Sequence, residues 1–289
     1  MCLLCDLKSP LPARPRPDHV WSSRRAFLLA GATSATAIAL PAAAQVNVGS
    51  ASSMRKLVPA DELEGAANQQ YGEMMAEARS KGALLPDRHP QVQRLRSMAR
   101  RLIPHTVPWN ARARDWRWEV QLIQSPQINA FCMPGGKIAF YTGILDKLKL
   151  NDDEAAMIMG HEMAHALREH ARERLAKTQA TGMGLSVLSQ LLGFGQLGDV
   201  AASLGTQLLT LKFSREDETE ADLVGLELAA RSAYQPGASV SLWQKMAAAN
   251  SGGAGLEFLS THPSGPERIR GLEANLPKVQ GLYESARRG

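Results

Sequence analysis

Two histidines and the glutamate that follows the first of them, His161, Glu162 and His165, are the residues of this chain whose types and spacing best fit chemistry. In an α-helix, residues four apart lie on one face, one turn apart, so both imidazoles can reach one metal ion. Glu162 then lies beside the ion without binding it and can take a proton from a water on the metal. The spacing predicts a zinc-dependent peptidase with Glu162 as the general base.

A catalytic zinc usually has three protein ligands and one open position, so a third ligand must come from elsewhere in the chain. The run from Ser214 to Asp222 is the best source because five carboxylates crowd it. If this run is helical, Glu218 and Asp222 share a face, whereas Glu220 is rotated by about 200° from Glu218 and points away. The remaining carboxylates are expected on the solvated face of the helix: Glu216, Asp217 and Glu220.

Other residues near the motif, and one in a predicted strand, are interpreted as having no part in the chemistry. The metzincin class of zinc peptidases needs a glycine at position 168 and a histidine at 171, and Arg168 and Ala171 exclude it. His170 is rotated by about 140° from His165 on an ideal helix, which predicts a surface residue. Cys132 is interpreted as a small packing residue in a strand.

The elements that must position these residues predict an α+β fold that is mainly helical. Apolar and polar residues alternate between Trp116 and Leu122, which indicates a half-buried strand. Two more strands are expected at 128–132 and 137–141, joined by a turn with two glycines. A small antiparallel sheet therefore precedes one long helix, from Asp152 to about Ala176, which carries both histidines.

The rest of the chain predicts further helices, at 61–81, 91–102, 199–212, 214–232, 237–250 and 266–275. The apolar, glycine-rich stretch 182–198 is interpreted as a cover over the cleft, as a contact for membrane-bound substrates or as ordinary core packing. A length of 289 residues and a hydrophobic content of 44% allow one large domain or two small ones. Because no stripe of Lys and Arg with interleaved aromatics occurs, nucleic-acid binding is not expected.

The N-terminus has the features of an export signal. S-R-R-A-F-L at 23–28 resembles a twin-arginine signal, and a short apolar run and A-A-A at 42–44 follow it. The predicted domains are a signal peptide at 1–44, a flexible lead-in at 45–60, a metallopeptidase domain at 61–276 and a C-terminal tail at 277–289. The predicted location is the periplasm, reached by the twin-arginine route. The alternatives are export as an unfolded chain and anchoring to the inner membrane by an uncleaved signal.

Four segments together resemble the zinc metallopeptidase family that includes HtpX, BepA, Oma-type proteases and CAAX prenyl protease 1. They are H-E-x-x-H at 161–165, S-R-x-x-E-x-E-A-D at 214–222, N-A-F-x-x-P-G-G at 129–136 and T-H-P-x-x-x-x-R at 261–268. The similarity extends from roughly residue 57 to 275. It is strongest to the periplasmic BepA-like branch, without the long C-terminal repeat domain of BepA. The resemblance implies a zincin-like (gluzincin) metalloprotease domain with one Zn²⁺ per chain.

The resemblance also implies roles for individual residues. Glu218 would be the third zinc ligand, and Asp222 would hold a ligand histidine in the correct tautomer. An extended substrate would pair with the strand residues Asn129, Ala130 and Phe131. His262 has two possible roles. It would either donate a hydrogen bond to the tetrahedral oxyanion as a catalytic residue, or, as in BepA-like relatives, occupy the open zinc position and keep the enzyme latent.

The predicted function is a zinc endopeptidase in protein quality control. Its substrates would be misfolded or unassembled envelope proteins, and peripheral contact with a membrane or an assembly machinery is left open. The competing class is a periplasmic chaperone or binding module with a latent metal site. The presence of Glu162 beside the ligands favours an enzyme, because a structural zinc needs no general base. A membrane-embedded prenyl-protein protease is disfavoured because the sequence lacks transmembrane spans.

Overall fold

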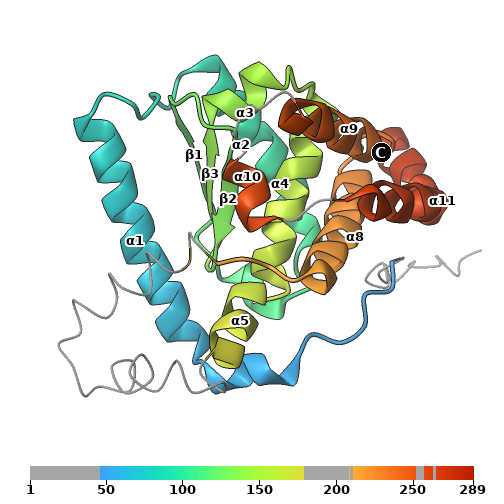
Figure 1. Cartoon of the computed structure of the whole chain (residues 1–289), viewed down its shortest axis with the longest axis horizontal. Coiled ribbons are helices and arrows are strands. Elements are labelled where there is room, and N and C mark those ends of the chain that lie inside the picture. Colours follow the sequence, from blue (N-terminus) through green and yellow to red (C-terminus); the bar gives the residue numbers. More distant parts are fainter. Residues whose placement is uncertain (1–45, 179–207, 209–210, 252–256, 263–264) are drawn as a thin grey trace, which may run out of the picture. The chain divides into compact units, whose positions relative to one another are not determined.

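The structure of the chain is a computed structural model that describes residues 46–178, 208, 211–251, 257–262 and 265–289 (Figure 1). The predicted signal peptide at 1–44, the apolar stretch 182–198 and nearly all of the helix predicted at 199–212 lie outside these residues. The described residues are mainly helical with one small sheet, which confirms the predicted fold class. None of their helices has both the length and the apolar character that crossing a bilayer requires.

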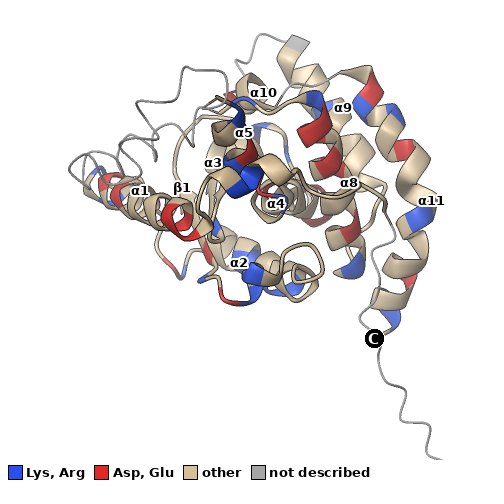
Figure 2. Ribbon diagram, turned by 90° about the horizontal axis from the view of Figure 1, so that it is seen from below, with Lys and Arg blue, Asp and Glu red and all other residues tan. Residues whose placement is uncertain are grey.

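Helix α4 (Asp152–Leu167) is the element against which the sheet and several helices pack. The Asn151 side chain accepts a hydrogen bond from the Glu154 backbone N–H, and the Glu154 carboxylate accepts one from the Asn151 N–H. This capping box satisfies donors at the start of the helix. Alanine, methionine and glycine fill much of α4, and nearly all of its residues are buried. In Figure 2 it lies between α2, α5 and α8.

The helix predicted from Asp152 to about Ala176 is two helices in the structure. α4 ends at Leu167, and α5 (His170–Thr178) follows a break at Glu169. Glu169 has φ 59°, in the left-handed region that non-glycine residues rarely adopt. Residues after the break therefore do not follow the rotation of the helix that carries the histidines.

The sheet contains β1 (Glu119–Ile123), β2 (Ala130–Met133) and β3 (Lys137–Tyr141) in the order β1-β3-β2. β2 and β3 form the predicted antiparallel hairpin, and Gly135 and Gly136 have φ of 83° and 79° in its turn. β1 instead pairs with β3 in parallel, so the prediction of a wholly antiparallel sheet is wrong. The connection between these two strands contains β2, which gives it the length that a parallel pairing needs.

Among the described residues β2 is consequently an edge strand that pairs with β3 on one side only. In Figure 1 the sheet lies on one side of α4, and α8 lies on the other. The remaining elements have these bounds: η1 (Ser53–Leu57), α1 (Ala60–Ser80), α2 (Pro90–Leu102), η2 (Ile103–His105), η3 (Ala111–Arg114), α3 (Thr142–Lys147), α8 (Arg215–Arg231), α9 (Ala238–Ser251), α10 (Glu257–Thr261) and α11 (Pro266–Arg288).

Both ends of the predicted peptidase domain continue into ordered elements. Within the expected lead-in, Val46 and Val58 are buried, and the backbone N–H of Val46 donates to Glu227 Oε2 at 2.9 Å. At the other end, the helix predicted at 266–275 continues through Pro277 to the end of α11. The buried Val279 packs this second half of α11 into the core. The expected tail at 277–289 is therefore largely helical.

Candidate metal centre

Four buried side chains meet between α4, α8 and the end of α10. They are His161, His165, Glu218 and His262, and one ligand atom from each lies within 4.8 Å of the others. The Nε2 atoms of His161 and His165 are 3.1 Å apart, and each lies 3.5 Å from an oxygen of Glu218. Among the described residues this is the only group of its kind.

The packing of α4 against α8 sets the positions of the ligands on these helices. The two helices touch at Gly160, which precedes His161 in sequence, and at Gly225, which lies against the His161 backbone. A Cβ added to Gly225 would lie 2.6 Å from the backbone nitrogen of His161, and one added to Gly160 would lie 2.8 Å from the carbonyl oxygen of Gly225. Only glycine permits this approach, so backbone contact between the helices brings Glu218 to the histidines.

The donor set fits zinc. The carboxylate of Asp222 can only accept a hydrogen bond, and it lies 3.0 Å from Nδ1 of His161. The proton of His161 is therefore on Nδ1, and the lone pair of its Nε2 faces the other donors. Imidazole nitrogens and a carboxylate oxygen that converge in this way need a cation between them, and zinc favours this ligand combination.

Arg268 of α11 pairs with two carboxylates of the centre, Asp222 and Glu218. Its Nε and Nη2 donate to the two oxygens of Asp222 at 2.8 and 2.6 Å, and Nη1 lies 2.6 Å from Glu218 Oε2. The guanidinium also stacks over Trp243, 3.6 Å from the ring centroid. Burial raises the pKa of Asp222, but the charge and hydrogen bonds of Arg268 and His161 outweigh it and hold this pKa below its ordinary value.

The sequence identifies Arg268 only as the last position of T-H-P-x-x-x-x-R. Nothing in that pattern indicates that its guanidinium reaches both Glu218 and Asp222, which lie on another helix. The structure thus adds a cation to the centre that sequence reasoning missed. A lone arginine at a fixed spacing from His262 was the available signal.

Glu162 is buried beside the donors but does not belong to their group. Its Oε1 atom has no hydrogen-bond partner among the described residues and lies 3.7 Å from Nε2 of His262. Burial raises the pKa of Glu162 above its ordinary value, despite the opposing charges of nearby histidines. A carboxylate with a raised pKa is better suited to accept and return a proton near neutral pH.

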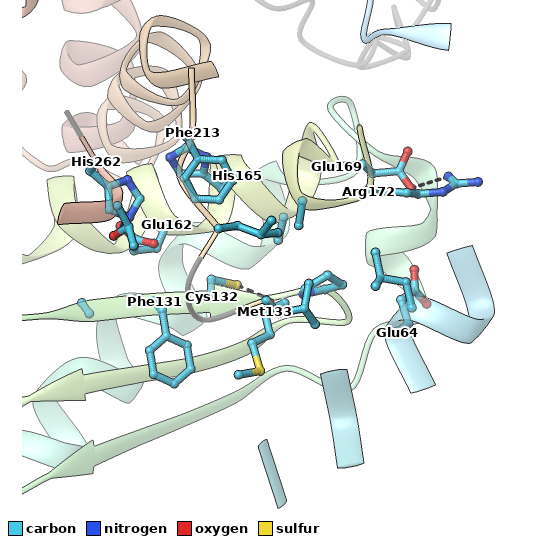
Figure 3. A pocket seen from close by; sticks show the side chains of 18 of the residues that line it. Glu64, Phe131, Cys132, Met133, Glu162, His165, Glu169, Arg172, Phe213 and His262 are labelled. Atoms are coloured by element: carbon cyan, nitrogen blue, oxygen red, sulfur yellow. Dashed lines mark hydrogen bonds and ion pairs between the residues drawn. The ribbon is translucent and has the colours of Figure 1, made fainter. Parts of the chain in front are cut away.

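A cavity of about 220 Å³ opens from the centre toward β2. Figure 3 shows Phe131, Cys132 and Met133 on one side of it, and Glu162, His165 and His262 on the other. All three residues of the predicted substrate strand line this cavity: Asn129, Ala130 and Phe131. Burial raises the pKa of the Cys132 thiol, so it stays protonated, which agrees with the predicted packing role.

Three residues that were predicted to lie on the surface are buried or half-buried in the structure and contact other groups. His170 is buried, with only 1% of its surface exposed, so the prediction of a surface residue is wrong. The prediction assumed an uninterrupted helix, and the break at Glu169 removes that assumption. Asp217 is also buried, in a capping box with Ser214, and Glu220 is half-buried beside Arg168 and His170. Glu216 is exposed, as predicted.

Comparison with known proteins gives the same class of enzyme. Residues 89–276 match the model of "Peptidase family M48". The chain is 36% identical over 222 residues to "Mitochondrial metalloendopeptidase OMA1" of Schizosaccharomyces pombe, covering 76% of this chain and 63% of that protein. It is 29% identical over 161 residues to "Metalloprotease LoiP" of Escherichia coli, covering 52% of this chain and 59% of that protein.

A third relative is matched over a smaller share of its own length. "Metalloendopeptidase OMA1, mitochondrial" of Homo sapiens is 30% identical over 178 residues, which is 58% of this chain and 34% of that protein. The chain thus spans less than two thirds of the length of these relatives. These matches contradict the predicted periplasmic location by twin-arginine export, because six of the relatives, 30–36% identical, are mitochondrial by name.

Proposed function

The chain belongs to peptidase family M48, and from this premise we propose that it is a zinc-dependent endopeptidase whose catalytic domain is residues 61–276. The observation that carries the proposal is the buried group of donors with Glu162 beside it, open to a cavity along an edge strand. Several relatives are also named metalloendopeptidases, which supports the same reaction.

The zinc would be held by His161, His165 and Glu218. When bound, it would polarise a peptide carbonyl and lower the pKa of a water molecule to about 7. Glu162 would accept a proton from the attacking water and deliver it to the leaving amine. Its buried carboxylate is suited to both steps because no described residue donates a hydrogen bond to its Oε1 atom.

The substrate would be a polypeptide in extended conformation. β2 has no strand on its outer edge within the described residues, so its backbone can pair with a substrate strand at Asn129, Ala130 and Phe131. We infer that misfolded or unassembled proteins are the substrates, since they expose the extended, unpaired segments that such an edge can bind. The name "Beta-barrel assembly-enhancing protease" of a relative that is 28% identical supports a role in protein quality control.

His262 would keep the resting enzyme latent. Its Nδ1 atom lies 3.0 Å from Glu218 Oε1 and 3.4 Å from Nε2 of His161, so it shares the space of the three proposed ligands. A fourth protein ligand would close the position that a substrate needs, as in structural zinc sites. The same observation favours a second candidate function, a binding module or chaperone with a latent site, if His262 never leaves.

The test compares the full chain with Glu162→Gln for zinc content and casein cleavage. Glu162→Gln should keep the zinc and lose about 10²- to 10⁴-fold in cleavage rate, the usual contribution of a general base. Glu173→Gln is the matched control, because Glu173 of α5 pairs with Lys177 and does not line the cavity. If the control cleaves casein and Glu162→Gln cleaves it as fast, the proposed role of Glu162 is wrong. If His262 keeps the unmodified chain inactive, the same comparison is made in His262→Ala. Zinc without cleavage in the unmodified chain and in His262→Ala would favour the binding module.

A further inference from the structure

His170 is a buried histidine that the proposed reaction does not use. Its Nδ1 atom lies 2.9 Å from Nδ1 of His165, which is the nitrogen of that proposed ligand that faces away from the metal position. The two rings meet edge to face at a centroid distance of 5.0 Å. A polar side chain this deeply buried needs hydrogen-bond partners, and both of its nitrogens have a neighbour.

The break between α4 and α5 creates this contact. On a continuous helix His170 would point about 140° away from His165, but the left-handed conformation of Glu169 turns it back. Two ion pairs hold Glu169 there, from Arg55 at 3.2 Å and from Arg172 at 2.7 Å. An uncommon backbone conformation is thus stabilised next to the centre, and its effect is to place one imidazole behind another.

On its other side His170 meets a carboxylate. Its Nε2 atom lies 3.4 Å from Glu220 Oε2, and Nε of Arg168 donates to the same oxygen at 2.7 Å. Arg168 also donates to the carbonyl oxygen of Gly49 at 3.1 Å. Because Arg168 already donates to this carboxylate, Glu220 is placed as the acceptor for an N–H of His170.

Only one proton arrangement satisfies these contacts when His165 presents Nε2 to a metal. The proton of His165 is then on Nδ1 and is donated to Nδ1 of His170. The proton of His170 must consequently be on Nε2, where it faces Glu220, which can only accept. Each nitrogen then has one role.

We propose that His170 is the positioning residue of His165, and that Glu220 fixes its tautomer. The inference rests on the proposed metal ligands. In this arrangement each ligand histidine is connected to a carboxylate by hydrogen bonds from its Nδ1 atom. His161 reaches Asp222 directly, whereas His165 reaches Glu220 through a second imidazole. Such partners orient the ring and raise the basicity of the ligand nitrogen.

The test measures zinc affinity by competition with a chromophoric chelator. His170→Leu removes the acceptor, and the affinity should fall by about 10- to 100-fold. His170→Asn offers an amide oxygen close to the position of Nδ1 and should retain most of the affinity. His105→Leu is the matched control, since His105 lies in η2 and outside the donor group. His170→Leu with the affinity of this control would overturn the proposal.

A second measurement is made on the unmodified chain and remains decisive if His170→Leu does not fold. Imidazole ¹⁵N chemical shifts, assigned with His170→Asn, should place the proton of His165 on Nδ1 and that of His170 on Nε2. A proton on Nδ1 of His170 would overturn the inference. Failure of the proposed metal site can be distinguished from failure of the proposed role of His170. In the first case the unmodified chain itself binds no stoichiometric zinc, and in the second it and His170→Leu bind zinc equally well.

Discussion

The two sides of the metal centre are built differently. His161, His165 and Glu218 project from α4 and α8, two long helices that touch through Gly160 and Gly225. His262 follows the five-residue helix α10, where its ring stacks on Phe258 at 4.4 Å and its N–H donates to the Phe258 carbonyl. Helix packing therefore fixes three donors, whereas local contacts hold the fourth. Such a centre can retain a metal while access to it changes.

Among changes to the part of the centre built on α4 and α8, Arg268→Met should lower the unfolding free energy most. It leaves two buried carboxylates, Glu218 and Asp222, without their cation, and breaking a buried pair in this way costs about 3–5 kcal/mol. Urea unfolding of the metal-free protein measures the loss. The control is Arg215→Met, because Arg215 is exposed and its pair with Glu267 lies at the surface. Equal losses in the two variants would show that Arg268 does not hold this side together.

Gly225→Ala should have the next largest effect. The added Cβ meets the backbone of His161, and because backbone cannot move as a side chain can, we expect a loss of about 1–3 kcal/mol in unfolding free energy. Gly72→Ala in α1 is the matched control, since its Cβ meets nothing within 4 Å. That control should gain up to about 1 kcal/mol from better helix propensity. If Gly225→Ala retains the stability and zinc affinity of the unmodified chain, close helix packing does not set the ligand positions.

These tests address features that differ in how far the sequence predicts them. The capped helix of the H-E-x-x-H motif and the face shared by Glu218 and Asp222 depend on local spacing, and the sequence predicts both. The contact between His170 and His165 depends on a helix break at Glu169 that no residue type there requires. The parallel pairing of β1 with β3 and the reach of Arg268 to α8 depend on tertiary packing. Local periodicity carries no information about either.

His262→Ala tests the fourth donor, which local contacts after α10 hold in place. It should lower the unfolding free energy less, by about 1 kcal/mol, as is usual for single substitutions. Zinc should remain, because the three helix-borne donors are intact. Casein cleavage should rise if His262 is a latch, and it would fall if His262 stabilises the oxyanion. His165→Ala provides the contrast, since it removes a helix-borne ligand and should abolish zinc binding. Loss of zinc in both variants would mean that the two sides are equivalent.

An effect on stability as small as that of His262→Ala, with none on cleavage, is expected at the start of α4, where Glu154 anchors the helix. Burial raises its pKa, but hydrogen bonds from Lys245, the Asn151 backbone and Ser241 outweigh it, so the pKa is lower in the folded protein than in the unfolded chain. The carboxylate therefore stabilises the fold above the unfolded pKa of about 4.3, and this contribution is lost as the pH falls through the folded pKa.

Glu154→Gln should accordingly lower the unfolding free energy by about 1 kcal/mol at pH 7, the usual value of a helix cap. The difference from the unmodified chain should shrink as the pH falls below 4.3, the unfolded value. Urea unfolding at several pH values measures it. Casein cleavage at neutral pH should not change, because Glu154 lies outside the cavity and the donor group. A change in cleavage without a change in stability would mean that α4 is not a rigid support, and the contrast with His262 would then fail.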